Sequence, residues 1–406
     1  MTQPTGAPLA GVTIVDLSNT LMGPYCSLQL ALLGANVIKV EEPAGDITRT
    51  IGQGRHPGMG PIFLNANHGK RSVAIDLKQS AGREVLLTLA RRCDVLIHNF
   101  RPAAVASLRL RYDDLRAANE TLIYCALTGF GSGGPYQDKA AYDDVIQAIS
   151  GVAAVQGGAA GPPQYVRSTL ADKVVGLLAF GAITTALLRR ERTGTGQAIE
   201  VPMFEAMAGF TALELQGGQI FDPPTGPSGY ARLATPYRRP YRTTDGYLGV
   251  VIYTDRQWHA FFDLIGTPEL GRDGRYSTIA ARTEHIHQLY EMVETVLATQ
   301  SSAHWVSRLD ALGIPAVPVQ GLEDLLHDPH LDAVSFFQRV EHPSEGPLRV
   351  ARSAIRFRES TDASVPPAPR LSEHAWPVLR EHGYTDDQIR QLAASAAIRL
   401  PEQEAQ

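Results

Sequence analysis

The sequence predicts an α/β protein with a doubly wound, Rossmann-like large domain and a smaller α+β domain. Strands and helices alternate from residue 11 to residue 129, which favours a parallel sheet covered by helices on both faces. The chain has 406 residues, which is too long for one ordinary core. A segment rich in proline and glycine, Asp222 to Pro240, separates this pattern from a second group of short elements.

The first βαβ unit is predicted from a β-branched strand at 11–17, a helix at 26–34 that ends at a glycine, and a strand at 35–41. Residues 43–61 contain many glycines and prolines, so we expect a loop there. Further strands are expected at 70–78, 93–100, 121–129 and 198–203, and helices at 80–92, 113–119 and 142–156.

A long apolar helix is predicted within Ser168–Gln197. Ser168, Thr169 and Asp172 are residue types that cap helix N-termini, and glycines end the stretch. The apolar run from Val174 to Leu188 is shorter than the roughly 20 residues that span a bilayer. We therefore expect a helix that is buried in a core, and no membrane as a partner.

Asp172 is a candidate nucleophile at the start of this helix. Burial would raise the pKa of its carboxyl group, whereas the helix dipole and backbone N–H donors would lower it. If the second effect is larger, the carboxylate is ionised and poorly hydrated, as a carboxylate nucleophile needs to be. A purely structural role as a helix cap is the alternative for Asp172.

The second group of elements begins with a β-hairpin predicted at 241–253, which turns at Asp245-Gly246. Helices are expected at 255–265, 281–298 and 303–313, followed by a short strand or bend at 314–320. The C-terminal part predicts a strand at 348–357 and a helix at 385–396.

Composition and charge exclude several classes of function. The formal net charge of −5 gives no reason to expect a nucleic acid or an anionic membrane as partner. Three scattered cysteines have neither disulfide nor metal spacing, and the histidines lack ligand spacing, so we expect no metal and a reducing, cytoplasmic location. The N-terminus does not read as a signal peptide.

Glycine-rich motifs give little support for a nucleotide site. Residues 129–134 have the G-x-G-x-x-G spacing, but Pro135 follows where a dinucleotide site needs a helix. No Walker A loop is present, so we expect no tightly bound cofactor and no ATP-driven chemistry. The cations at predicted strand ends lie where an open α/β sheet binds ligands, or they are solvated edge charges: Lys70, Arg71, Lys78 and Arg101.

Several segments together resemble the class III coenzyme A transferase family, which includes formyl-CoA transferase and carnitine CoA-transferase. The segments are 11–43, GKRSVAIDLK (69–78), DVLIHNFRPA (94–103), LTGFGSGGPY (127–136), AYDDVIQAISG (141–151), 170–206 and LLHDPHLD (325–332). The resemblance covers nearly the whole chain, and it aligns Asp172 with the catalytic aspartate of the family.

The resemblance implies a large domain built from both ends of the chain, a small domain joined by two linkers, and a homodimer of interlocked subunits. On this basis the expected boundaries are 1–210 for the N-terminal part of the large domain, 211–240 for a linker, 241–325 for the small domain, and 326–406 for the second linker and the rest of the large domain.

The resemblance also implies a reaction between an acyl-CoA donor and a carboxylic acid acceptor, with coenzyme A as co-substrate. Asp172 would attack the thioester to form an anhydride, and CoA thiolate would convert it to an aspartyl-CoA thioester. The acceptor carboxylate would then attack the aspartyl-CoA thioester, and the same two steps would run in the reverse direction to give the new acyl-CoA. Preorganised N–H donors would stabilise the oxyanions.

The CoA-binding residues that the resemblance implies are Leu21, Met22, Ile75, Lys78, Asn99, Phe100, Arg101, Lys139 and Tyr142. Lys78 and Arg101 would face phosphates, and Phe100 would pack on adenine or pantetheine. Two positions depart from the family pattern. Ser107 replaces a common arginine, which leaves Arg109 or Arg111 to make that contact or leaves a phosphate without it. Leu21 replaces a glutamine of the formyl-CoA:oxalate branch, which argues against an oxalate-type substrate.

Two alternative functions stay open. The α-methylacyl-CoA racemases of this family pair the aspartate with a histidine, but this chain reads Ala141-Tyr142-Asp143 in that segment, so transfer is favoured over racemisation. A non-catalytic CoA-thioester-binding protein is the other alternative, and the intact Asp172 argues against it.

The identities of the donor and the acceptor acid are not determined by the sequence. Arginines and tyrosines cluster around the first linker, among them Arg232, Arg238 and Arg239. The second carboxylate of a dicarboxylic acid such as succinate would pair with one of them. In the alternative interpretation, these arginines belong to a linker exposed to water and bind no substrate.

Overall fold

The computed structural model describes residues 6–158, 161–359 and 365–401. Contacts between Cα atoms divide the chain into two compact units. Unit 1 comprises Met1–Ala153, Tyr165–Phe210 and Asp332–Gln406, and unit 2 comprises Ala154–Gln164 and Thr211–Leu331. Both ends of the chain therefore contribute to unit 1.

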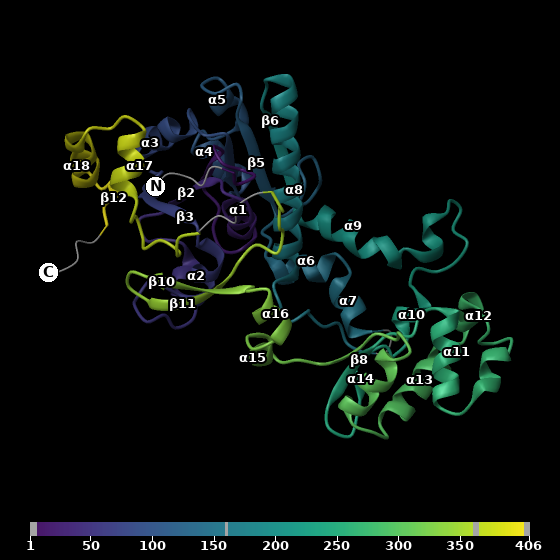
Figure 1. The fold of residues 1–406 in the computed structure, drawn as a ribbon. Coiled ribbons are helices and arrows are strands. Elements are labelled where there is room, and N and C mark those ends of the chain that lie inside the picture. The colour runs from purple at the N-terminus through teal and green to yellow at the C-terminus, as the bar shows by residue number, and fades with distance from the viewer. Residues whose placement is uncertain (1–5, 159–160, 360–364, 402–406) are drawn as a thin grey trace. The chain divides into compact units, whose positions relative to one another are not determined.

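A seven-stranded sheet forms the centre of unit 1 (Figure 1). The strand order is β12-β3-β2-β1-β4-β5-β6. All neighbours pair in parallel except β12, which runs antiparallel to β3. The strands are β1 (Thr13–Asp16), β2 (Asn36–Glu41), β3 (Lys70–Ile75), β4 (Val95–His98), β5 (Ile123–Thr128), β6 (Gln197–Pro202) and β12 (Ile398–Arg399). The order from β3 to β6 is that of doubly wound dinucleotide-binding domains, and the predicted α/β class with a mainly parallel sheet is confirmed.

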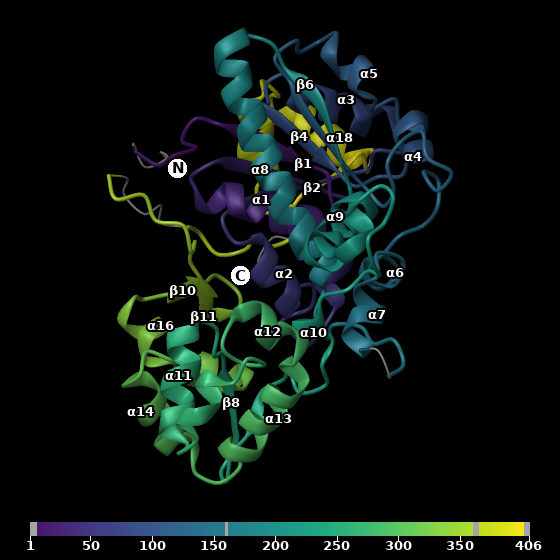
Figure 2. The ribbon, with the colours of Figure 1, turned by 90° about the vertical axis from the view of Figure 1, so that its right-hand side faces the viewer.

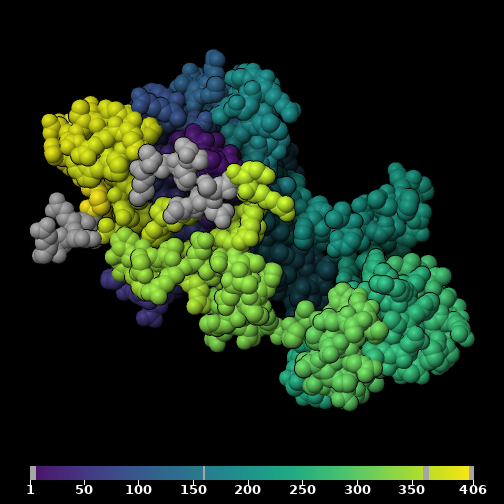
Figure 3. Space-filling model, viewed as in Figure 1, coloured from purple at the N-terminus to yellow at the C-terminus, as the bar shows by residue number. Residues whose placement is uncertain are grey.

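Helices cover both faces of this sheet. Helices α1 (Met22–Leu32) and α8 (Leu170–Thr193) pack on one face (Figure 2). Helices α3 (Ser80–Ala90), α17 (Ala375–Glu381) and α18 (Asp386–Ala394) pack on the other. Strands buried on both sides are apolar almost throughout, which explains why these segments read as uninterrupted β-branched runs. In Figure 3 the C-terminal segment, in yellow, lies beside the blue residues of the first half of the chain.

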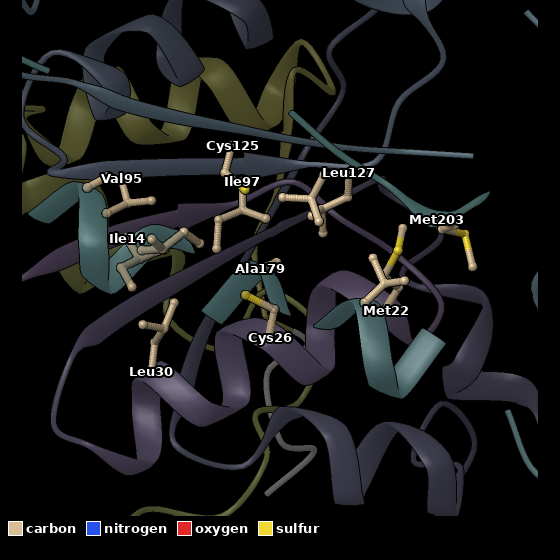
Figure 4. Close-up of a cluster of buried hydrophobic side chains, with 14 of the residues drawn as sticks. Ile14, Met22, Cys26, Leu30, Val95, Ile97, Cys125, Leu127, Ala179 and Met203 are labelled. Atoms are coloured by element: carbon tan, nitrogen blue, oxygen red, sulfur yellow. The ribbon is translucent and has the colours of Figure 1, made fainter. Parts of the chain in front are cut away.

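The contact between α1 and α8 forms much of the first core. Figure 4 shows side chains of α1 pointing toward those of the strands, with Ala179 of α8 beside them. The α1 residues labelled there are Met22, Cys26 and Leu30, and the strand residues include Ile14, Val95, Ile97, Cys125 and Leu127. Gly176 of α8 allows the close approach, because a Cβ atom there would lie 2.8 Å from the backbone oxygen of Met22.

Helix α8 differs from its prediction in two respects. Its N-cap is Thr169, whose side chain makes no capping hydrogen bond, although its C-cap is a left-handed glycine, Gly194, with φ of 72°. One side of α8 is also exposed in the single chain: Leu177, Leu178 and Leu188 are 47%, 52% and 53% exposed. The expectation of burial on all sides is therefore wrong for this chain alone.

By length and composition α8 is the one helix of the described residues that is long and apolar enough to cross a membrane. Core helices of soluble proteins pass the same test, and 39% of its most apolar stretch is buried inside the chain.

The remaining elements of the chain show where local patterns were misread. Gly151, with φ of 86°, separates two helices where the sequence predicts a single helix at 142–156. A hairpin, β10 (Phe337–His342) with β11 (Gly346–Ala351), replaces the predicted strand at 348–357. The other helices that lie in or reach into unit 1 are α2 (Pro61–Asn67), α4 (Pro102–Ser107), α5 (Tyr112–Arg116), α6 (Asp143–Ile149), α7 (Val152–Gly157), α9 (Met203–Leu215), α16 (Pro329–Ala333) and the 3-10 helix η1 (Ile47–Thr50).

Unit 2 contains a three-stranded antiparallel sheet with its own apolar core. Its strands are β7 (Tyr241–Arg242), β8 (Tyr247–Val250) and β9 (Ala316–Pro318), and β7 and β8 form the predicted hairpin. Its helices are α10 (Ala231–Ala234), α11 (Asp255–Leu264), α12 (Ile279–Glu284), α13 (Ile286–Leu297), α14 (Ser302–Asp310), α15 (Leu322–Leu325) and the 3-10 helices η2 (Gly217–Ile220) and η3 (Pro268–Arg272).

Candidate active site

A cavity of about 390 Å³ lies in unit 1 beyond the carboxyl ends of β1 and β4. These strands are neighbours at the point where the strand order reverses, which is where doubly wound sheets bind ligands. The cavity is large enough for part of a cofactor-sized molecule. Its lining includes Asn19, Thr20, Met22, Ile47, Asn99, Phe100, Arg101, Leu127, Gly129, Lys139, Tyr142, Asp172 and Met203.

Two asparagines join the ends of β1 and β4 at the cavity. The backbone N–H of Asn19 donates to Oδ1 of Asn99 at 3.1 Å, and Nδ2 of Asn99 donates to the backbone oxygen of Asn19 at 3.0 Å. Thr20 follows in the left-handed region, with φ of 69°. A threonine rarely adopts that conformation, so surrounding contacts hold the turn.

Asp46 supplies part of the support for this turn. Its Oδ1 accepts hydrogen bonds from the backbone N–H of Thr48 at 2.9 Å and of Thr20 at 3.4 Å. Its Oδ2 lies 2.9 Å from Nζ of Lys39, and both side chains are 1% exposed. Nζ of Lys39 also donates to the backbone oxygen of Ser18 at 2.9 Å. The buried ion pair between Lys39 and Asp46 therefore holds the chain at Ser18 and at Thr20, on either side of Asn19.

A second buried ion pair lies behind the first. Asp16, at the end of β1, is 3.5 Å from Nζ of Lys70. Burial acts to raise the pKa of Asp16, but Lys70 and Lys39 outweigh it and the pKa is lowered. Burial lowers the pKa of Lys70 to about 7 against the opposing effect of Asp16. Lys70 is therefore part of the interior support of the site, and the prediction that it is a ligand-facing or edge cation is wrong.

Asp172 lies at the third position of α8, and its side chain is partly buried in the cavity lining. Its carboxylate accepts no hydrogen bond from the described residues. Its backbone N–H donates at 3.0 Å to Oδ2 of Asp143, the first residue of α6. Asp143, and not Asp172 itself, therefore caps α8.

Gln147 fixes the capping carboxylate. Its Nε2 donates to Oδ1 of Asp143 at 2.5 Å and to the backbone oxygen of Ser168 at 3.2 Å. Its Oε1 accepts from the backbone N–H of Val166 at 2.9 Å. Gln147 and Asp143 are buried, so the start of α8 is held by a network that is shielded from water.

Burial, followed by the nearby carboxylate of Asp143, raises the pKa of Asp172 to about 7, while Lys173 has a smaller opposing effect. Burial therefore has a larger effect on the pKa of Asp172 than the helix dipole and the backbone N–H donors, which were expected to lower it. At neutral pH the carboxyl group is divided about equally between its acid and its carboxylate form. A group poised in this way is typical of an active site.

Cations and aromatic rings surround the outer part of the cavity. Arg101 and Lys139 are exposed, and Nζ of Lys139 lies 3.9 Å from the centre of the Tyr136 ring. Phe100 is partly buried, and Tyr142 is 69% exposed. This surface combines positive charge with stackable rings, which suits a phosphorylated nucleotide ligand.

Seven of the predicted residues thus line one cavity: Met22, Asn99, Phe100, Arg101, Lys139, Tyr142 and Asp172. Leu21, Ile75 and Lys78 are not part of its lining. Leu21 is the N-cap of α1 next to Met22, Ile75 is buried in the core on the opposite sheet face, and Lys78 is exposed in the turn after β3. Ser107 donates to the backbone oxygen of Ala104, and Arg109 and Arg111 are exposed.

Sequence patterns did not identify Asn19, Thr20 and Asp143 as residues of the site. Asn19 and Asn99 each follow a strand beside the reversal of strand order, a signal that becomes useful once the order is known. Asp143 looks like an ordinary acidic residue in the first turn of a helix, and only tertiary structure shows that it caps a different one. Among the described residues, no cluster of three or more histidine, cysteine or acidic side chains is arranged to hold a metal ion.

Comparison with known proteins supports the resemblance noted from the motifs. The model of CoA-transferase family III matches residues 9–375. The chain is 30% identical over 393 residues to succinyl-CoA:glutarate CoA-transferase of Mus musculus, which covers 96% of this chain and 90% of the relative. It is 30% identical over 416 residues to formyl-CoA:oxalate CoA-transferase of Shigella sonnei, covering 96% and 99%. A CAIB/BAIF family protein from Brucella suis has a similar crystal structure, with a TM-score of 0.78, 32% identity, and coverage of 93% and 100%.

Proposed function

The chain belongs to CoA-transferase family III and is a CoA-transferring enzyme, and we propose that Asp172 is its covalent nucleophile. The observation that carries the proposal is the placement of the Asp172 carboxylate. It lies in a cavity at the strand-order reversal, without a hydrogen-bond donor among the described side chains, and cations line the same cavity.

The proposed reaction exchanges one thioester for another through four acyl transfers. The Asp172 carboxylate attacks the donor thioester carbonyl and expels CoA thiolate, which leaves an aspartyl-acyl anhydride. The thiolate then attacks the aspartyl carbonyl, releases the donor acid as its carboxylate, and forms aspartyl-CoA thioester. The acceptor carboxylate expels the thiolate again to form a second anhydride. Attack by thiolate on the acceptor acyl carbonyl restores Asp172 and yields the new acyl-CoA.

The cavity offers groups for each part of this cycle. The start of α1 at Leu21 and Met22 presents backbone N–H groups that are not used within the helix, and we assign it the stabilisation of oxyanions. Arg101 and Lys139 would bind CoA phosphates, and Phe100 and Tyr142 would pack on the adenine or pantetheine. Asn99 would hold an amide, and Lys78, exposed in the turn after β3, would bind a CoA phosphate, whereas the buried side chain of Ile75 would not contact CoA.

We further propose a cytoplasmic homodimer with interlocked subunits, and domains bounded near 210, 240 and 325. The exposed apolar side of α8 supports the dimer, because Leu177, Leu178 and Leu188 would otherwise contact water. A dicarboxylic acid is the proposed acceptor, because succinyl-CoA:glutarate CoA-transferases are among the relatives. Sedimentation analysis of the purified chain tests the dimer, since a monomer at micromolar concentration contradicts it.

Mass spectrometry tests the nucleophile. The protein is mixed with acetyl-CoA, succinyl-CoA or a branched acyl-CoA in the presence of hydroxylamine, and the peptides are analysed. We expect an aspartyl hydroxamate at Asp172 with a productive donor, and no adduct in Asp172→Asn. If turnover occurs while Asp172 is never labelled, and the Asp172→Asn variant remains active, the covalent assignment is wrong.

Racemisation is the alternative that the raised pKa of Asp172 favours, since an acid near pKa 7 transfers protons well. It needs a second proton-transfer group, and no histidine is present among the described residues that line the cavity. Incubation with a 2-methylacyl-CoA in D₂O separates the two functions. Deuterium at the α-carbon without a carboxylic acid acceptor would support racemisation, and exchange of CoA without deuterium would support transfer.

A further inference from the structure

Unit 2 contains a cavity of about 420 Å³ with mainly apolar walls, formed between its small sheet and two helices. Tyr241, Val250 and Val317 line it from the strands, and Trp258 and Tyr290 line it from α11 and α13. This volume is in the range of small-molecule sites. Two arginines, Arg238 and Arg239, also belong to its lining.

The two lining arginines differ in their partners. Nη2 of Arg239 lies 2.6 Å from Oε1 of Glu294, so its charge is compensated. Arg238 is exposed and forms no ion pair with any acidic group in the described part of the chain. The other nearby acid, Glu291, accepts a hydrogen bond from the hydroxyl of Tyr237 at 2.7 Å. Arg238 is therefore the lining cation that remains available for an anion.

A second uncompensated cation lies behind the cavity wall. Arg232 is 1% exposed, and its Nε and Nη1 have no hydrogen-bond partner among the described residues. Its Nη2 donates to the hydroxyl of Tyr290, a lining residue, at 3.4 Å. The guanidinium lies 5.0 Å from the centre of the Tyr253 ring, and it forms no ion pair with an acidic group among the described residues, so an anion bound nearby would be favoured by its charge.

A donor without a partner lies behind the surface of the cavity wall. Nε1 of Trp258 is buried and has no hydrogen-bond partner among the described residues. A buried indole N–H usually has an acceptor. The cavity surface thus combines apolar side chains with the unpaired cation Arg238, which match an aliphatic chain and a carboxylate, respectively.

We propose that this cavity is a binding site for an aliphatic carboxylic acid, with the carboxylate at Arg238 and the hydrocarbon chain against Val250 and Val317. The site consists only of residues of unit 2, and it does not require Asp172. The proposed function enters only in the choice of acids to test, because carboxylic acids are the class that a CoA transferase handles.

The test measures binding to the full-length protein by isothermal titration calorimetry without any CoA ester. The ligands are hexanoate and glutarate, with hexan-1-ol as an uncharged control. We expect both acids to bind more tightly than the alcohol. Arg238→Ala should weaken acid binding by roughly tenfold to a hundredfold, as expected for the loss of a charged hydrogen bond. The matched control is Arg242→Ala, which removes an exposed arginine of β7 that does not line the cavity. This variant should bind both acids as tightly as the native protein does.

The Asp172→Asn variant separates this proposal from the proposed function. Acid binding that survives in Asp172→Asn and fails in Arg238→Ala supports a site in unit 2, whether or not Asp172 is a nucleophile. The proposal is overturned if Arg238→Ala binds acids as the native protein does, if Asp172→Asn abolishes binding, or if neither acid binds at millimolar concentration. A change in oligomeric mass of Arg238→Ala without acid binding would assign the cation to a subunit contact instead.

Discussion

The carboxylate of Asp143 accepts a hydrogen bond from the backbone N–H of Asp172, so two acidic residues meet at the start of one helix. Asp143 thereby accepts from a free N–H group in the first turn of α8, and its negative charge opposes ionisation of the Asp172 side chain. Burial is the larger cause of the rise in the pKa of Asp172 to about 7, and the Asp143 carboxylate adds to it, although the residue lies at the positive end of a helix dipole.

Formation of the acyl-enzyme should depend on pH. In the proposed reaction only the carboxylate form of Asp172 would attack the thioester, and with a pKa of about 7 the ionised fraction rises about tenfold between pH 6 and pH 8. We expect kcat/KM for the acyl-CoA donor to rise by that factor and to level off above pH 8. The measurement is a pH series at donor concentrations below KM. A flat profile from pH 6 to pH 8 would show that Asp172 is already ionised in the free enzyme.

The substitution Asp143→Asn should lower the pKa of Asp172, because it removes a neighbouring negative charge. The pH profile of kcat/KM should therefore shift to lower pH. Stability should fall by about 1–3 kcal/mol, because an amide cannot accept from both Asp172 N–H and Gln147 and leaves two donors facing each other.

The matched control for this prediction is Asp144→Asn. Asp144 is the next residue of α6 but is exposed, so the substitution Asp144→Asn should leave both the pH profile and the unfolding temperature unchanged. Equal shifts in the two variants would mean that a general change in charge, rather than the Asp143 contact, sets the pKa of Asp172.

The substitution Asp172→Asn should stabilise the protein at neutral and alkaline pH. The pKa of Asp172 is higher in the folded protein than its ordinary value of 3.8, so its contribution to stability is complete below pH 4 and is lost as the pH rises to about 7. Asparagine stays neutral, and the variant should gain roughly 2–4 kcal/mol relative to the native protein by pH 7–8. Thermal unfolding at pH 5 and pH 8 measures this, and a less stable variant at pH 8 is the opposing result.

Two glycines of α8 should respond in opposite ways to alanine. A Cβ atom at Gly176 would lie 2.8 Å from the backbone oxygen of Met22, so Gly176→Ala should push α1 away and cost about 1–3 kcal/mol. A Cβ atom at Gly181 has no atom within 4 Å, so Gly181→Ala should add about 0.5–1 kcal/mol through helix propensity. Denaturant unfolding of both variants compares them directly. A gain in stability from Gly176→Ala would contradict the close packing of α1 and α8.

The alternation of strands and helices was sufficient to predict the sheet of unit 1, because each buried strand is a short apolar run bounded by turn residues. Segments whose structure depends on distant contacts were not recognised. Strand β12 has two residues and pairs only with β3, and α17 packs on a core formed by residues far away in the chain. Neither element has a local pattern strong enough to identify it.

The candidate site was likewise predictable only where it depends on local sequence motifs. Asp172, Asn99 and Arg101 were predicted from a resemblance to known motifs, and one cavity brings them together. The role of Asp143 depends on α6 lying against the start of α8, and the state of Asp172 depends on a balance of burial and charge. Neither the role of Asp143 nor the protonation state of Asp172 is determined by a single segment of the sequence. The direction of the pKa shift of Asp172 therefore required the folded chain.

The pairing of β12 with β3 also has a consequence for biosynthesis. Ile398 is translated more than three hundred residues after its partner Ile75. Throughout that interval the edge of β3 has no strand beside it, and such an edge is able to pair with other nascent chains. Unit 1 is thus completed only after unit 2 has been translated.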